Sequence, residues 1–400
     1  MDPDFERRLA AEIEGALPWA RALRRDLHAH PELAGEESYA SGVVRRELER
    51  AGVPFRAQIA GTGVVGWIVP GGAPGPDGIA LRADMDALPI EEATGLEHAS
   101  RNPGCMHACG HDGHTAMLLG AARVLARLRS ELRRSVKFVF QPAEEVGWGA
   151  RAMIEAGTLD ERVGGFAAAR AFALHGWPDI PLGTLATRPG PMMASIQDFR
   201  IEVRGRGGHA SEPERTVDPI VAGAHIVTAL QTLVSRSLSP LEAGVVSVGS
   251  FRAGEAANVI PETATLRGTI RALDDRAAAE LAGRLEAVAR GAASAFGAAV
   301  RVEIEELAPV TANDPAAVEF LREAVRGSPR LANLRILEKP VMGSEDFAFF
   351  ARALPSCFAF LGLGPSGEGR RALHTPRFDF ADEALGAGIE AFVRLALHGG

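Results

Sequence analysis

Residues 105–114 read Cys-Met-His-Ala-Cys-Gly-His-Asp-Gly-His, and residues 140–145 read Phe-Gln-Pro-Ala-Glu-Glu. The first stretch holds three of the 11 histidines and two of the 3 cysteines of the chain. Gly110 permits a sharp turn between Cys109 and His111, so that a thiolate and an imidazole can reach one cation. Adjacent carboxylates at a strand end, Glu144 and Glu145, diverge and can supply a metal ligand and a general base. Together the two stretches predict a hydrolytic metal centre.

Two further histidines are candidate ligands because each lies beside an apolar run that is interrupted by Gly or Pro. These are His175 in Ala-Leu-His-Gly-Trp-Pro and His374 in Ala-Leu-His-Thr-Pro, although either one alone is explained more simply as a loop residue. The candidate metal ligands are Cys109, His111, Glu145, His175 and His374. This set is larger than a tetrahedral zinc site needs, so we expect two divalent metals that share a bridging carboxylate or water. Zn, Mn, Co and Ni can each occupy such mixed sites.

Four further residues each have two interpretations. Glu144 is the candidate general base, which takes a proton from water and later gives one to the leaving amine; the alternative is a carboxylate that stabilises a helix N-terminus. Asp86 either orients a ligand histidine from behind or caps a loop. His28 and His30 have metal-like spacing, but they close a predicted helix, where a histidine cation is favourable. We therefore interpret these two histidines as structural.

Helical and strand patterns alternate over the first half of the chain. Residues 5–27 have apolar side chains at helical spacing, and residues 136–140 (apolar except for Lys137) and 171–174 are short segments typical of buried strands. The alternation predicts an α/β domain with a mostly parallel sheet. The candidate ligands then fall at the edge of the sheet where open α/β folds bind their ligands.

The pattern changes after residue 191. Residues 196–204 alternate between apolar and polar, which indicates a strand with one solvated face. The segments that follow give a β-α-β-β-α-β order, typical of a two-layer α+β domain of ferredoxin-like order. We therefore predict a discontinuous catalytic domain (residues 1–187 and 308–400) and an inserted domain (residues 188–307).

The predicted insertion carries its own polar residues. His209 lies on a glycine-rich turn after a strand, where it could stabilise the oxyanion of a tetrahedral intermediate. Asn258 and Arg271 flank another strand region and could bind a substrate carboxylate, since Arg pairs with carboxylates bidentately. For each of the three, the alternative is an ordinary surface hydrogen bond.

Composition narrows the class of protein. A chain of 400 residues exceeds what one core usually holds, which favours two domains. The net charge of −8 argues against a nucleic-acid partner, and the absence of a long uncharged apolar run argues against a membrane span. The polar N-terminus does not resemble a signal peptide, so we expect a cytoplasmic protein. Cys105 and Cys357 are expected to be buried thiols, not partners in a disulfide.

These motifs, in this order, resemble the M20 metallopeptidase family, and within it the aminoacylase-like amidohydrolases that cleave N-acyl amino acids. That group includes hippurate hydrolases and auxin–amino acid conjugate hydrolases. The resemblance covers nearly the whole chain. It rests on Leu27-His-Ala-His-Pro-Glu-Leu, Leu81-Arg-Ala-Asp-Met-Asp-Ala-Leu-Pro, Met106-His-Ala-Cys-Gly-His-Asp-Gly-His, Phe140-Gln-Pro-Ala-Glu-Glu, Gly205-Arg-Gly-Gly-His-Ala, Asn258-Val-Ile-Pro, Gly268-Thr-Ile-Arg, Met342-Gly-Ser-Glu-Asp-Phe and Leu373-His-Thr-Pro.

The resemblance implies a di-metal site at the five candidate ligands, with Glu144 as base. It also implies an inserted domain that dimerises or acts as a lid, and therefore a homodimer or a higher homo-oligomer. His209, Asn258 and Arg271 would bind substrate, either in their own subunit or in the neighbouring one. Gly343 would line the pocket with backbone amides.

Two positions depart from the pattern of the group. Glu214 follows Pro213 where the group commonly has His, which could alter substrate preference or lid contacts. Trp148 stands where relatives often have a glycine run, and its bulk could narrow the acyl side of the pocket. Neither change removes a predicted catalytic group.

The resulting hypothesis is an enzyme that hydrolyses the amide bond of N-acyl amino acids, a small-molecule substrate, to a free amino acid and a carboxylic acid. One alternative is a dipeptidase or aminopeptidase on the same scaffold, although no group for a free substrate ammonium is evident. A second alternative is a catalytically silent binding protein. The sequence does not determine the acyl group, the preferred amino acid or the native metal.

Overall fold

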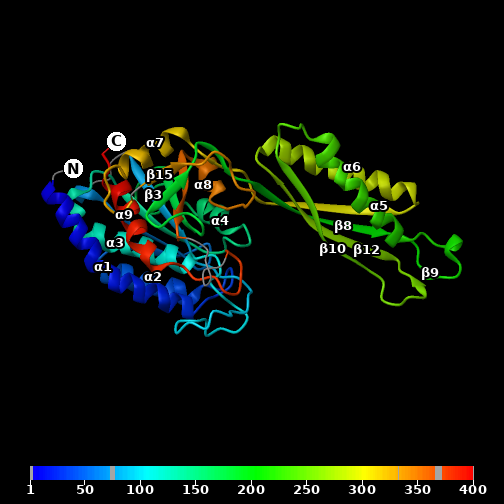
Figure 1. Cartoon of the computed structure of the whole chain (residues 1–400), viewed down its shortest axis with the longest axis horizontal. Coiled ribbons are helices and arrows are strands. Elements are labelled where there is room, and N and C mark those ends of the chain that lie inside the picture. Colours follow the sequence, from blue (N-terminus) through cyan, green and yellow to red (C-terminus); the bar gives the residue numbers. More distant parts are fainter. Residues whose placement is uncertain (1–2, 73–76, 332, 365–371, 400) are drawn as a thin grey trace. The chain divides into compact units, whose positions relative to one another are not determined.

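The computed structural model describes residues 3–72, 77–331, 333–364 and 372–399. The chain divides into two compact units, shown in Figure 1. Unit 1 comprises Met1–Met192, Ala312–Lys339 and Asp346–Gly400, and unit 2 comprises Met193–Thr311 and Pro340–Glu345. The catalytic role predicted for residues 1–187 and 308–400, and the lid or dimerisation role predicted for residues 188–307, stay predictions.

The centre of unit 1 is an eight-stranded sheet. Its strands, in order across the sheet, are β1 (Phe55–Ile59), β2 (Gly63–Ile68), β4 (Val136–Gln141), β3 (Gly78–Asp84), β5 (Ala168–Trp177), β16 (Ser356–Gly362), β6 (Thr184–Thr187) and β15 (Asn333–Ile336). The pairs β4–β3, β3–β5, β5–β16 and β6–β15 are parallel, whereas β1–β2, β2–β4 and β16–β6 are antiparallel. Every residue of β3 and β4 is buried, as expected for central strands covered on both faces. The α/β fold with a mostly parallel sheet is therefore confirmed.

Helices α1 (Pro3–Ala29), α3 (His111–Arg127) and α9 (Leu385–Leu397) lie side by side in unit 1 (Figure 1). The contact between α3 and α9 is close, because a Cβ atom at Gly120 would lie 2.6 Å from the Cδ1 atom of Ile389. The other elements of unit 1 are α2 (Ser38–Arg50), α4 (Gly149–Glu155), α7 (Pro315–Ala324), α8 (Ala348–Ala353), and the 3-10 turns Pro70–Gly72, Arg129–Glu131 and Asp382–Ala384. Within the described ranges, no helix has both the length and the apolar character needed to cross a membrane.

Unit 2 contains a four-stranded antiparallel sheet with the order β10 (Gly244–Ala253), β12 (Thr263–Ala272), β8 (Ser195–Arg204) and β13 (Ala299–Ala308). Helices α5 (Pro219–Thr232) and α6 (Asp275–Ala295) lie side by side on this sheet (Figure 1). Along the chain these elements follow the β-α-β-β-α-β order expected from the sequence. The remaining elements of unit 2 are β9 (Gly208–His209) with β11 (Val259–Ile260), the 3-10 turn Pro213–Arg215 and the π-helical turn Leu233–Ser237. β7 (Gly190–Met193) pairs with β14 (Thr311–Asn313), and most residues of both strands belong to unit 1.

Candidate metal centre

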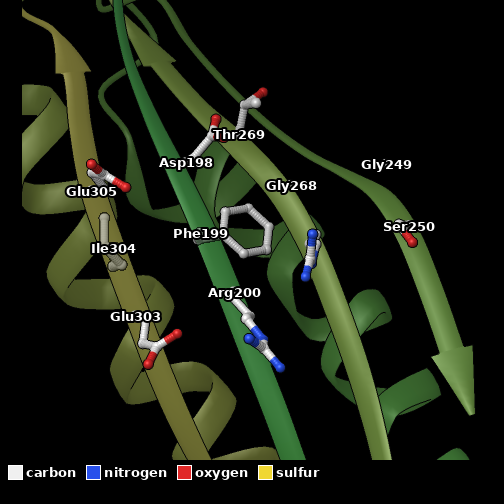
Figure 2. Close-up of a pocket in the computed structure, with 11 residues that line it drawn as sticks. Asp198, Phe199, Arg200, Gly249, Ser250, Gly268, Thr269, Glu303, Ile304 and Glu305 are labelled. Atoms are coloured by element: carbon white, nitrogen blue, oxygen red, sulfur yellow. The ribbon is translucent and has the colours of Figure 1, made fainter. Parts of the chain in front are cut away.

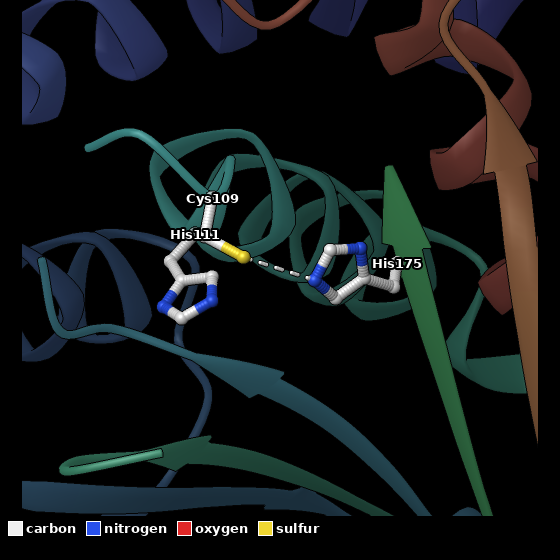
Figure 3. A group of neighbouring side chains, drawn as sticks. All are labelled: Cys109, His111 and His175. Atoms are coloured by element: carbon white, nitrogen blue, oxygen red, sulfur yellow. Dashed lines mark hydrogen bonds between the residues drawn. The ribbon is translucent and has the colours of Figure 1, made fainter. Parts of the chain in front are cut away.

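The N-terminus of α3 places two of the predicted ligands. Gly110 precedes the helix in a left-handed conformation with φ of 93°, which a residue with a side chain would adopt only under strain. This turn allows Cys109, just before the helix, and His111, its first residue, to face the same space as His175 on β5 (Figure 3). All three side chains are buried. One ligand atom from each lies within 4.8 Å of the others, a geometry that can hold a cation.

Cys109 also belongs to a second group of possible ligands, which contains Glu145 and His374. The sulfur atom of Cys109 lies 3.3 Å from Nε2 of His175 and 3.3 Å from Nε2 of His374. The amide of His374 donates to the carbonyl of Ala108 at 2.8 Å, which fixes this distant loop beside the thiol. The structure therefore brings together all five predicted ligands, with Cys109 shared between two groups.

Glu144, the candidate general base, lies beside the predicted ligands. His111 Nε2 lies 3.8 Å from Oε1 of Glu145 and 4.0 Å from Oε2 of Glu144, and these three residues form another possible metal-binding group. Side by side in the chain, the two carboxylates thus both reach the edge of the cluster. One of them can bind a cation while the other stays within reach of a water molecule beside it.

The charges around the cluster favour a bound cation. Burial lowers the pKa of His111, but the carboxylates of Asp84 and Asp86 outweigh this effect and raise the pKa to about 10. Burial, with a further contribution from Asp86, raises the pKa of Glu145 to about 7, although His111 acts in the opposite direction. Burial also lowers the pKa of His175, which favours the neutral imidazole that metals bind. Without metal, His111 therefore holds a proton that a bound cation would replace, whereas His175 offers a neutral nitrogen.

Two atoms of the cluster provide a direct test of whether a metal fits. Among the residues that the structure describes, His111 Nε2 and Glu145 Oε1 are buried atoms without a hydrogen-bond partner. Leaving such atoms unsatisfied is costly, and a cation between them would satisfy both. Thiolate, imidazole and carboxylate together are a ligand set that divalent transition metals accept. The residues present therefore fit a metal centre.

Hydrogen bonds behind the cluster direct the histidine rings. Nδ1 of His111 donates to the backbone carbonyl of Asp86 at 2.8 Å, and Nδ1 of His175 donates to the carbonyl of Gly176 at 2.9 Å. His114 accepts the amide of Gly176 at 2.8 Å and contacts Asp84 at 2.7 Å. These bonds occupy the Nδ1 atoms and leave Nε2 of both candidate ligands facing the cluster.

Asp86 lies behind a candidate ligand histidine, as the sequence analysis expected, and its carboxylate has a second set of partners. Its two oxygens accept the backbone amides of Glu144 and Glu145, each at 3.0 Å. The ring of His111 also faces Asp86, since its Nδ1 donates to the backbone carbonyl at 2.8 Å and lies 3.4 Å from Oδ1 of the carboxylate. Asp86 therefore supports both the histidine and the paired glutamates.

The remaining predicted site residues lie in unit 2. His209, on β9, is exposed, and its Nδ1 accepts the amide of Ser211 at 3.1 Å. Asn258 is close to it, since its carbonyl accepts the amide of Ala210 at 3.1 Å. Arg271, on β12, donates to the carbonyl of Met342 at 3.0 Å and to Ser344 at 3.3 Å, on either side of Gly343. Unit 2 thus has one pair at His209 and Asn258, and another at Arg271 and Gly343.

Unit 2 also carries a pocket of about 560 Å³ over its sheet, shown in Figure 2. Its described lining includes Asp198, Arg200, Glu303 and Glu305 but none of the predicted site residues. Burial, and then the charge of Glu305, raise the pKa of Asp198. Acidic and basic groups alternate on this surface, as on a solvated sheet face, so we assign it no chemistry.

Comparison with known proteins identifies a family that this chain matches. Residues 80–398 match the model of Peptidase family M20/M25/M40. IAA-amino acid hydrolase ILR1-like 4 from Arabidopsis thaliana is 41% identical over 383 residues, covering 94% of this chain and 85% of the relative. N-acetylcysteine deacetylase from Bacillus subtilis is 39% identical over 377 residues, covering 94% of this chain and 95% of the relative.

Two solved structures are also similar to this chain over nearly its whole length. A Bacillus subtilis protein described as a dinuclear metal binding peptidase from the M20 family is 34% identical, with a TM-score of 0.80, covering 96% of this chain and 98% of the other. A structure described as a putative aminohydrolase from methicillin-resistant Staphylococcus aureus is 33% identical, with a TM-score of 0.89, covering 98% of this chain and 99% of the other. This chain therefore belongs to Peptidase family M20/M25/M40. Within the family it is an amidohydrolase of the aminoacylase-like group, as the motifs predicted.

Proposed function

We propose that this protein hydrolyses the amide bond of N-acyl amino acids and releases a free amino acid and a carboxylic acid. The observation that carries the proposal is the cluster around Cys109, in which two groups of possible ligands share one thiol and lie beside the paired carboxylates Glu144 and Glu145. The relatives support the choice of bond, since their names describe hydrolysis of acylated amino acids.

Cys109, His111, Glu145, His175 and His374 would hold two divalent metal ions, with Cys109 common to both groups. When bound, such ions polarise a carbonyl oxygen and lower the pKa of water. The mixture of sulfur, nitrogen and oxygen ligands suits Zn, Mn, Co or Ni. We place the enzyme in the cytoplasm. The supply of metal ions there would decide which of the four metals it binds. The three free cysteines support that compartment.

Glu144 is the proton carrier in this proposal. It accepts a proton from the water that attacks the carbonyl carbon, and it delivers a proton to the amine nitrogen as the C–N bond breaks. One water is consumed, its oxygen and one hydrogen become part of the carboxylic acid, and its other hydrogen completes the amine. The support for this role is the position of Glu144 next to the candidate ligand Glu145 and 4.0 Å from His111.

Unit 2 would supply the groups that recognise substrate. His209 would donate a hydrogen bond to the oxyanion of the tetrahedral intermediate. Arg271 would bind the carboxylate of the amino acid, together with Asn258 and the backbone at Gly343. We further propose that the protein is a homodimer formed through unit 2, and sedimentation of the purified chain tests this.

Trp148 is the side chain that we place at the acyl side. It precedes α4, three residues after Glu145, and 42% of it is exposed, so it can contact a ligand near the cluster. Its bulk would restrict long acyl chains. Trp148→Ala should therefore raise activity on long-chain substrates relative to acetyl substrates.

A substrate panel tests the proposal. Purified protein loaded with Zn²⁺, Mn²⁺, Co²⁺ or Ni²⁺ is assayed with acetyl, benzoyl, indole-acetyl and long-chain acyl amino acids, and with free dipeptides. We expect release of amino acid from at least one acylated substrate and little from dipeptides. Faster cleavage of dipeptides would favour the dipeptidase alternative, and no turnover with any metal would favour a binding protein.

A further inference from the structure

Residues 142–149, which we call the glutamate loop, carry Glu144 and Glu145 and run from the end of β4 to the first residue of α4. Three consecutive amides at its start donate to buried carboxylates. The amide of Ala143 donates to Oε1 of Glu37 at 2.9 Å, and those of Glu144 and Glu145 donate to Asp86. The backbone before and through the paired glutamates is therefore held by side chains from two other parts of unit 1.

Ala143 is the point of the loop where such support matters most. Its φ of 54° is left-handed, a conformation that residues with a side chain rarely adopt. Both of its backbone groups are engaged, because its carbonyl also accepts the amide of Gly149 at 3.2 Å. Gly149 itself has no room for a side chain, since a Cβ atom there would lie 1.7 Å from the carbonyl oxygen of Pro142. The loop is thus closed at its base around one strained residue.

Glu37 is well suited to hold that residue. Its side chain is fully buried at the N-terminus of α2. Oε1 accepts the amides of Gly35 and Ala143 at 2.8 and 2.9 Å, and Oε2 accepts the hydroxyl of Thr62 at 2.5 Å. One carboxylate therefore joins three separate segments of the chain, and the glutamate loop is one of them.

We propose that Glu37 is a positioning residue for the paired glutamates. By fixing the amide of Ala143, it sets the direction in which the chain enters Glu144 and Glu145. Its effect is geometric and requires an acceptor at the position of Oε1, not a negative charge. This inference rests on the roles proposed above for Glu144 and Glu145.

Two conservative substitutions at Glu37 separate the effect of its charge from the effect of its side-chain length. In Glu37→Gln the amide oxygen can still accept both backbone amides, and the new NH₂ group can donate to Thr62, whose hydroxyl accepts as well as donates. In Glu37→Asp the charge stays, but the carboxylate is one methylene shorter and cannot keep all three contacts. Positioning therefore predicts that Gln is tolerated and Asp is not.

Glu32→Asp is the matched control. Glu32 also accepts backbone amides near the start of α2, those of Tyr39 and Ala40 at 2.8 to 3.1 Å, and these amides lie outside the glutamate loop. The same shortening at Glu32 should lower thermal stability at most. It should leave kcat unchanged.

The first readout is amide hydrogen exchange of the full chain without metal, which does not depend on catalysis. Glu37→Asp should accelerate exchange at residues 143–145 but not in β3, whereas Glu37→Gln and Glu32→Asp should match wild type there. The second readout is steady-state kinetics at saturating metal. A small misplacement of catalytic groups costs up to about 10²-fold, so kcat of Glu37→Asp should fall roughly 10- to 100-fold with KM little changed.

Unchanged exchange in Glu37→Asp would show that Glu37 does not hold the loop. Faster exchange with normal kcat would show that the loop needs no such support, and a large loss in Glu37→Gln would assign the effect to charge; each result overturns the inference. An active Glu144→Gln variant would instead contradict the proposed function, while the exchange result would stand.

Discussion

The sulfur atom of Cys109 lies 3.3 Å from Nε2 of His374, although 265 positions separate the two residues in the chain. The same sulfur lies 3.3 Å from Nε2 of His175. Loss of this one thiol would therefore affect both groups of candidate ligands. Metal binding at the two groups should be coupled through Cys109.

The first prediction concerns the reactivity of Cys109. An alkylating reagent should inactivate the metal-free protein faster than the metal-loaded protein, because a bound metal shields the thiolate. Burial raises the pKa of Cys105 to about 11 and of Cys357 to about 12, so these two thiols should contribute little. Mass spectrometry of the labelled peptides identifies the modified residue. Equal rates of inactivation with and without metal would mean that Cys109 is not a ligand.

The second prediction separates the paired carboxylates. Glu144→Gln should retain both metals and lose turnover, because the amide keeps the shape of the side chain but accepts no proton. Removal of a general base typically lowers kcat by about 10²–10⁴-fold. Glu145→Gln is the matched comparison and should lose metal. Metal analysis beside kcat decides, and a Glu144→Gln variant that lost metal or kept a near-normal rate would reverse the assignment.

The third prediction concerns His209, which lies in unit 2. His209→Ala should lower kcat strongly without changing metal content, since none of the candidate ligands lies in its unit. Ser211→Ala is a suitable control, because it removes the hydroxyl near Nδ1 of His209 but keeps the ring. A normal kcat in His209→Ala would leave this histidine without a catalytic role.

Mixing His209→Ala with Glu144→Gln tests whether His209 acts in its own subunit. If it serves a neighbouring subunit, mixed dimers contain one site with both wild-type groups, and part of the activity returns. Subunit exchange is followed separately with differently tagged chains. Exchange without recovery would exclude action across subunits.

The fourth prediction follows from His28, which is buried and lies 2.8 Å from Asp112. Burial lowers its pKa, but Asp112 and Glu92 outweigh burial and raise the pKa from 6.5 to about 9. The folded state thus binds the proton more tightly than the unfolded state, and the stabilisation is complete below pH 6.5 and is lost as the pH rises through 9. The difference in melting temperature between wild type and His28→Gln should shrink over this range.

His398→Gln is the control for that experiment. Burial lowers the pKa of His398, so its contribution should change on the acid side of its ordinary value and not on the alkaline side. All three proteins are measured without metal, so that changes of metal loading with pH do not enter the comparison. A wild-type advantage over His28→Gln that stayed constant up to pH 10 would show that the His28 ring is not charged in the folded protein.

Much of the fold could be predicted because buried elements leave strong patterns. β4 is a fully buried strand whose residues are apolar except for Lys137 and Gln141, and the helices have clear apolar periodicity. The strands at the edges of the sheet were missed: β1 alternates between partly buried and exposed residues, and β15 is mostly exposed. Their order comes from pairing with neighbours, which a local pattern does not contain.

The candidate ligands could be predicted because cysteine and histidine are rare in this chain and occur here close to one another or beside apolar segments that Gly or Pro interrupts. Glu37 could not be predicted, since a carboxylate that accepts a backbone amide 106 positions away requires no particular residue at the other end. The contacts of Asp346 could not be predicted either. Its carboxylate accepts hydrogen bonds from the side chains of Arg82 and Gln141 and from the amide of Ala150, each at 2.8 to 2.9 Å. Such contacts depend on the tertiary fold alone.

The place of β16 in the sheet has a consequence for biosynthesis. This strand lies between β5 and β6. The ribosome must therefore synthesise unit 2 and residues 356–362 before the sheet of unit 1 can be completed. At about 5–20 residues per second, on the order of tens of seconds pass between the synthesis of Cys109 and that of His374. Throughout that interval Cys109 lacks His374, so the second group of candidate ligands is incomplete. Completion of the cluster is thus a late event in the life of the nascent chain, and a translation stop before Ser356 removes His374 and leaves a gap in the sheet.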